Sequence, residues 1–139
     1  MNMRILDMQY IRYLNLLERV SNVRTKHCFI YNNIILFVVP RAIMARAIGP
    51  DAKNIKKIYE ITGKKARIIG MPSSVEEAGK FISEIIAPFY FNEINIKDKE
   101  IIIKAGSNNK SALIGRNRAR LTELQGIVKD YFDMSLRIL

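Results

Sequence analysis

The sequence predicts an α+β fold in which one small module of three helices and three strands occurs twice in tandem. The expected elements recur in one order: helix, strand, strand, helix, glycine turn, helix and strand. When the two copies are aligned at their glycine turns, Ile48 matches Ile114 and Gly49 matches Gly115. Hydrophobic residues make up 49% of the 139 residues, enough for both copies to bury a core. We therefore expect two domains, residues 1–71 and residues 72–139.

The first copy opens with an amphipathic helix over residues 8–20, because apolar residues recur every three positions from Met8 to Leu17. Asn32 and Asn33 separate the next two strands and tolerate the positive φ angles of a tight hairpin. Gly63 ends the last helix of the copy as a C-terminal cap. The other elements expected are strands over 26–31 and 34–39, helices over 41–48 and 53–61, and a strand over 65–69.

The second copy begins after a boundary at Gly70, Met71 and Pro72. Its first helix is expected to start at Ser73 or Ser74 and to continue to residue 86, before Pro88. The elements expected after that helix are strands over 89–96 and 100–104, helices over 107–114 and 119–130, and a strand over 132–139.

Composition excludes several classes of function. One Cys and one His allow no internal disulfide and offer few metal ligands, which fits a cytoplasmic protein without a metal or cofactor. No apolar run reaches the roughly 18 residues that a membrane span needs. His27 and Cys28 point to opposite faces of a predicted strand, so they cannot act as a nucleophile and its base. We expect no catalytic residues and no enzymatic activity.

The net charge of +10 is concentrated in the first half of the chain. Residues 1–70 carry 13 Lys and Arg against 4 Asp and Glu, whereas residues 71–139 carry 10 against 9. Such an asymmetry is typical of a surface that faces a polyanion.

The two glycine turns carry the most specific functional pattern. Segments 45–58 (ARAIGPDAKNIKKI) and 111–124 (SALIGRNRARLTEL) each join a helix of small residues to a basic helix. The start of a helix offers free N–H groups and a positive dipole end, which favour a nearby phosphate. Asp51 is the only acidic residue in the first segment. Neither turn has the Gly-Lys-Ser/Thr ending of a Walker loop or the glycines of a dinucleotide fingerprint.

The strand, helix, glycine turn, helix and strand of each copy resemble the KH motif, in which a GXXG loop clamps single-stranded nucleic acid. The helix and strand before each core match the type II arrangement. The resemblance therefore implies two tandem type II KH domains, each a small mixed three-stranded sheet with three helices. More narrowly, the chain resembles the archaeal NusA family of transcription factors, and this resemblance spans essentially the whole chain. The segments that carry it are IRYLNLLERVSNVRTKHCFI, FVVPRAIMARAIGPDAKNIKKI and LIGRNRARL. It implies a form without the S1 domain and without the polymerase-binding N-terminal domain of the bacterial protein.

The resemblance places RNA contacts at the two turns and along the adjacent groove. Each turn keeps the first glycine of GXXG, but Ala52 and Arg118 stand where the second glycine is expected. The candidate RNA-binding residues are Arg46, Ile48, Gly49, Pro50, Asp51, Ala52, Lys53, Lys56, Lys110, Ile114, Gly115, Arg116, Asn117, Arg118 and Arg120.

The basic glycine turns predict a monomeric protein that binds single-stranded RNA. The resemblance to the archaeal NusA family implies that it acts in transcription termination or antitermination, with RNA polymerase as a further candidate partner. Two alternatives remain open, and the missing second glycines favour the first of them. One is a protein-interaction scaffold that binds RNA polymerase or ribosomal proteins through its basic face. The other is a KH-containing ribosome assembly protein.

Overall fold

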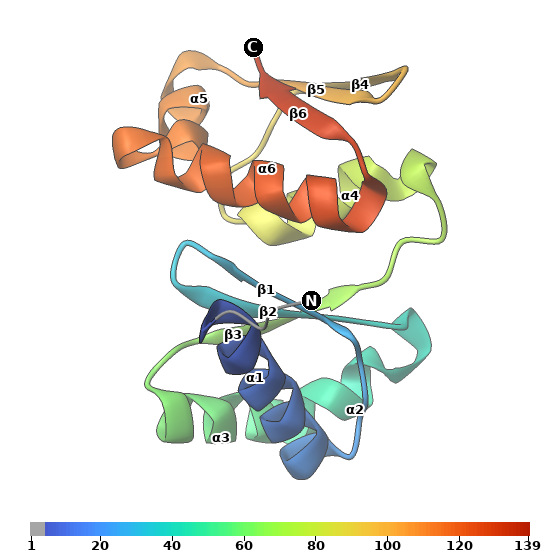
Figure 1. The fold of residues 1–139 in the computed structure, drawn as a ribbon, viewed down its shortest axis with the longest axis vertical. Helices are drawn as coiled ribbons and strands as arrows, with labels where there is room; N and C mark the ends of the chain where they lie inside the picture. The colour runs from blue at the N-terminus through green and yellow to red at the C-terminus, as the bar shows by residue number, and fades with distance from the viewer. Residues whose placement is uncertain (1–4) are drawn as a thin grey trace. The chain divides into compact units, whose positions relative to one another are not determined.

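The computed structural model describes residues 5–139, with side chains from Met8 onward. The chain divides into two compact units, with the boundary between Met71 and Pro72. In each unit, three helices lie on one face of a three-stranded mixed sheet (Figure 1). The predicted fold class, α+β with two tandem small KH-like modules, is confirmed.

The first unit has β2 at the centre of its sheet, antiparallel to β1 and parallel to β3. Asn32 and Asn33 have φ angles of 51° and 64°, so the predicted hairpin conformation is confirmed. Short 3-10 turns, Arg41–Ile43 and Pro50–Ala52, precede the second and third helices. The elements are α1 (Ile5–Ser21), β1 (His27–Tyr31), β2 (Ile34–Val39), α2 (Met44–Ile48), α3 (Lys53–Thr62) and β3 (Ala66–Gly70).

The core of the first unit forms between β2 and the three helices. Side chains alternate along a strand, so Ile35, Phe37 and Val39 share the face that the helices cover. All three are fully buried, and the same cluster holds Leu17 of α1 and Ile58 of α3. The hydrophobic effect therefore fixes the helices on this face of the sheet.

The second unit repeats this topology, with β5 antiparallel to β4 and parallel to β6. Its buried residues include Phe81, Ile101 and Leu124. The ring of Phe81 lies 5.0 Å from the ring of Tyr131 and 5.6 Å from the ring of Phe132. The elements are α4 (Ala78–Ile86), β4 (Glu93–Lys97), β5 (Glu100–Lys104), α5 (Ser107–Ile114), α6 (Ala119–Phe132) and β6 (Ser135–Ile138).

Two predicted boundaries in the second unit are wrong. The strand expected over 89–96 begins only at Glu93, because the Phe89 N–H donates to the carbonyl of Ile86 and closes a turn instead. The strand expected over 132–139 begins only at Ser135. Phe132 belongs to α6, since its ring packs against the core from the helix, and Asp133 then ends the helix at a φ of 56°.

The repeat is therefore not uniform along the chain. The last helix of the second unit has 14 residues, whereas α3 has 10. Ile35 pairs with Ala66 in the first sheet, and the matching Ile101 pairs with Leu136 in the second. The final strand of the second unit thus starts later than the alignment of the glycine turns predicts. One extra helical turn in α6 accounts for the difference.

Candidate nucleic-acid interface

The two glycine turns have the same backbone although they share only the glycine. Gly49 has φ 80° and ψ 162°, and Gly115 has φ 74° and ψ 173°. The third and fourth residues of each turn are left-handed, with φ angles of 54° and 57° in the first turn and 56° and 61° in the second. Those residues are Asp51 and Ala52, then Asn117 and Arg118. The duplication has thus preserved an unusual loop conformation rather than a loop sequence.

Both glycines are required by the backbone, and the space around Gly49 adds a steric reason. Their dihedral angles lie in a region that is essentially restricted to glycine. A Cβ atom at Gly49 would lie 2.8 Å from Nδ2 of Asn54, and one at Gly115 would lie 3.1 Å from Cγ of Arg120. The glycine N–H ends the preceding helix by donating to Ala45 in the first turn, at 2.9 Å.

The residue five positions after each glycine clamps the turn. Nδ2 of Asn54 donates to the carbonyls of Arg46 and Ala47, at 3.1 and 3.2 Å. Arg120 occupies the matching place in the second unit, and its guanidinium donates to the carbonyl of Ala112 at 2.6 Å. In both units a side chain from the second helix therefore satisfies the carbonyl end of the first helix.

Arg120 therefore makes contacts that stabilise the fold. Besides the bond to Ala112, its guanidinium carbon lies 5.4 Å from the centre of the Phe89 ring, a cation–π arrangement. Arg120 was expected to contact RNA, and these contacts leave it half-buried.

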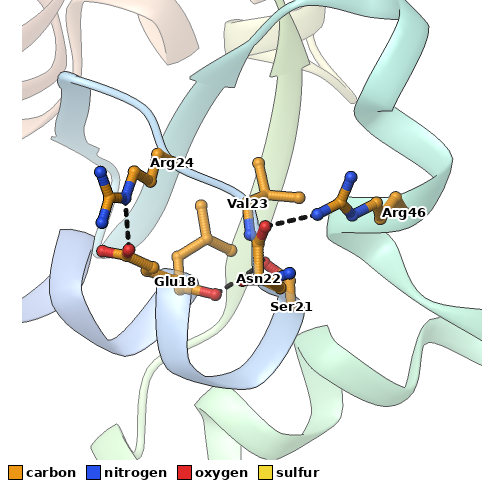
Figure 2. Close-up of polar contacts among 7 residues, drawn as sticks. Glu18, Ser21, Asn22, Val23, Arg24 and Arg46 are labelled. Atoms are coloured by element: carbon orange, nitrogen blue, oxygen red, sulfur yellow. Dashed lines mark hydrogen bonds and ion pairs between the residues drawn. The ribbon is translucent and has the colours of Figure 1, made fainter.

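Arg46 also has a structural contact. Its guanidinium donates to the carbonyl of Asn22, just beyond the end of α1, at 2.7 Å. Figure 2 shows this contact. The Asn22 N–H donates back to the carbonyl of Glu18 at 2.7 Å. Beside it, Arg24 pairs with the Glu18 carboxylate. Arg46 thus ties α2 to the end of α1, although the residue as a whole is exposed.

The remaining candidate residues surround the turns at different depths. Arg116, Asn117 and Arg118 are exposed in the second turn, where Lys110, Ile114 and Gly115 are half-buried. In the first turn Pro50, Asp51, Lys53 and Lys56 are exposed, and Ile48, Gly49 and Ala52 are half-buried. The structure therefore brings each predicted set together around its own turn. Whether these residues bind RNA stays a prediction.

Two shallow hollows flank α3 in the first unit. The first lies at the turn, lined by Pro50, Asp51, Lys53, Lys56, Lys57 and Glu60. The second lies between α3 and the start of β3, lined by Ile55, Lys56, Tyr59, Glu60, Lys65 and Ala66. The sequence analysis did not single out Tyr59 or Lys65, because helical spacing alone does not show that Tyr59 is exposed.

Ala52→Gly is expected to raise the free energy of unfolding by about 1 kcal/mol. The left-handed conformation costs an L-residue about 1–2 kcal/mol, and glycine adopts it without that cost. The gain exceeds the extra chain entropy that glycine loses on folding. Denaturant unfolding of the variant measures the change. The control is Ala45→Gly, at an exposed helical position, where a loss of about 1 kcal/mol is expected. Equal signs for the two variants would contradict the strain argument.

His27 and Cys28 do not form a reactive pair. They are successive residues of β1, and Cys28 is buried in the core cluster. Burial raises the pKa of the Cys28 thiol to about 12, so the thiol stays protonated at neutral pH. Burial also lowers the pKa of His27. Among residues 8–139, no three His, Cys, Asp or Glu side chains gather in a group that could hold a metal ion.

Within the described part of the chain, no helix combines the length and the apolar character needed to cross a bilayer.

Comparison with known proteins supports a distant relationship. No family model matches the chain. The chain is similar to a protein of Methanocaldococcus jannaschii described as "Probable transcription termination protein NusA", with 27% identity over 128 residues that cover 89% of this chain and 68% of that protein. The fold resembles that in "Crystal structure of APE1850", with a TM-score of 0.66 and 20% identity, covering 94% of this chain and 97% of that one. The structural likeness shows the fold, and the sequence similarity supports a relationship to an archaeal NusA.

Proposed function

We propose that this protein binds single-stranded RNA through its two glycine turns and acts in transcription, without catalysing a reaction. The observation that carries the proposal is the second turn, where Arg116 and Arg118 are exposed and the left-handed residues Asn117 and Arg118 lead directly into α6. Among the residues that the structure describes, no side chain caps the start of that helix. A phosphate there would meet both guanidinium groups and the positive end of the helix dipole.

The first turn supplies a weaker phosphate site. Pro50 has no N–H to donate, and the exposed Asp51 carboxylate repels a phosphate. Lys53 and Lys56 lie beside it and reduce that repulsion. We therefore assign the larger share of phosphate binding to the second unit.

Similarity to the archaeal NusA supports a role in transcription. We propose termination or antitermination as the step affected, in the cytoplasm and with RNA polymerase as a partner. The proposal can be tested by adding the protein to transcription by its cognate polymerase and measuring the fraction of transcripts that read through a terminator.

The double variant Arg116→Glu/Arg118→Glu is expected to weaken binding of single-stranded RNA about thirtyfold at ~0.1 M salt. Losing two phosphate contacts should also make the slope of log affinity against log salt shallower by about 1.4. Fluorescence anisotropy with a labelled oligonucleotide measures both quantities. Both side chains are exposed, so the fold should be retained.

The matched control is Lys97→Glu/Lys99→Glu, which reverses two exposed charges at the β4–β5 hairpin of the same unit. We expect this control to lower the affinity about threefold at most, through the general field of the protein. Equal losses in the two variants would contradict a site at the second turn. If the protein instead retained RNA polymerase but bound no RNA, the interaction scaffold would be favoured. The side chains of Ala52 and Arg118 also favour the scaffold, because they limit how closely a phosphate backbone can approach the turns.

A further inference from the structure

An exposed tyrosine stands at the far end of α3 from the glycine turn. Tyr59 is 52% exposed, whereas the residue before it in α3, Ile58, is fully buried. Its side chain lines the hollow between α3 and β3. It also lines a second hollow beside the β1–β2 hairpin, formed by Asn32, Asn33, Ile34, Tyr59, Gly63, Lys64 and Lys65. Tyr59 is therefore shared by two adjoining depressions.

Lysines surround this ring. Lys56 lies one helical turn before Tyr59, and Lys64 and Lys65 follow the end of the helix. Glu60 is the acidic residue along these hollows, and its carboxylate lies 3.8 Å from Nζ of Lys57. The surroundings of Tyr59 are thus positive, and the potential suits a phosphate chain passing over the ring.

The repeated fold does not need a tyrosine here. When the units are aligned at their glycine turns, the equivalent residue of α6 is Gln125, which is half-buried. Its Nε2 donates to the carbonyl of Leu136 at 3.1 Å, so this place in the second unit is closed by a hydrogen bond. Packing accepts an amide at this position, so the repeated fold does not by itself explain the exposed ring of Tyr59.

A single exposed apolar residue is common in proteins and carries little meaning alone. An exposed aromatic ring within a positive groove is the arrangement by which proteins hold single-stranded nucleic acid. The ring stacks on a base and the cations contact the backbone. The two hollows are lined by mainly small, apolar or basic residues around that ring.

We propose that Tyr59 is a stacking platform for one RNA base, with Lys56, Lys64 and Lys65 contacting the adjoining phosphates. The inference rests on the proposed RNA binding and deepens it. In this proposal the two units have different roles. The second unit binds phosphate at its basic turn, and the first unit binds a base at the end of α3, away from Asp51.

Anisotropy titrations with a labelled random-sequence RNA of about twelve nucleotides test the proposal. We expect Tyr59→Ala to weaken binding about tenfold and Tyr59→Phe to change it by about twofold at most, since the ring is retained. Tyr90→Ala is the matched control, because Tyr90 is 61% exposed and belongs to the second unit. It should leave the affinity unchanged. Circular dichroism should show the same fold for all variants.

An abasic oligonucleotide of the same length separates stacking from charge. Wild type and Tyr59→Ala should bind it equally, because it offers phosphates but no base. Suppose that Tyr59→Ala binds RNA as tightly as the wild type, while Arg116→Glu/Arg118→Glu binds it more weakly. This result would overturn the stacking platform and leave the proposed function intact. A Tyr59→Phe loss as large as that of Tyr59→Ala would also overturn it. Absence of RNA binding by the wild-type protein would refute both.

Discussion

Gly49→Ala is expected to lower the free energy of unfolding by about 3 kcal/mol. The added methyl group would force a φ of 80° and ψ of 162° on a residue with a Cβ, and would approach Nδ2 of Asn54 to 2.8 Å. Asn54 cannot turn away freely, because the same nitrogen donates to two carbonyls of α2. The substitution therefore adds backbone strain and breaks the clamp.

Denaturant unfolding followed by circular dichroism measures this loss. Gly126→Ala is the matched control, since Gly126 lies within α6, is exposed, and has open space where the methyl group would be added. There alanine favours the helix and should add about 1 kcal/mol. A Gly49→Ala protein as stable as wild type would show that the turn does not require glycine.

Phe37→Ala is expected to lower the free energy of unfolding by about 4 kcal/mol. Phe37 lies on the central strand β2, is fully buried, and belongs to the cluster that joins the sheet to the helices. Truncation removes apolar contacts and leaves a cavity that the two flanking strands keep open. Phe37→Leu, which fills much of that space, should cost about 1 kcal/mol.

The comparison residue is Phe29, on the edge strand β1 and only half-buried. Phe29→Ala should cost less than about 2 kcal/mol, because part of that side chain already contacts water. Thermal or denaturant unfolding of the three variants gives the ranking. A larger loss for Phe29→Ala than for Phe37→Ala would contradict the assignment of the core.

The sequence predicted the fold where a local signal and the hydrophobic pattern agreed. Asn32 and Asn33 marked a hairpin, and the glycine turns marked the break between two helices in each unit. The prediction was wrong where aromatic residues, which favour strands, were assigned to a strand that the structure does not form. Phe89 closes a turn, and Phe132 extends α6, because their rings find partners that only the tertiary structure brings near. Asp133 ends α6 without the glycine that would have marked the boundary.

The sequence predicted which residues gather at each glycine turn, but not which of their side chains make contacts that stabilise the fold. Arg46 and Arg120 have the same charge as Arg116 and Arg118, yet each donates to a carbonyl of a neighbouring helix end. Residue type shows that a donor exists, whereas only coordinates show which acceptor it meets. Asn54 was overlooked for the same reason, since a clamp residue has no signature in composition or charge.

Each glycine turn lies inside the crossover that joins two parallel strands, from β2 to β3 in the first unit and from β5 to β6 in the second. The ends of a crossover must reach a fixed separation before its strands can pair. A ligand that holds the turn in its left-handed form therefore favours docking of the final strand, and a docked strand favours the ligand by the same free energy. RNA bound at the turns, as we propose, would therefore be linked to completion of each sheet in a single equilibrium.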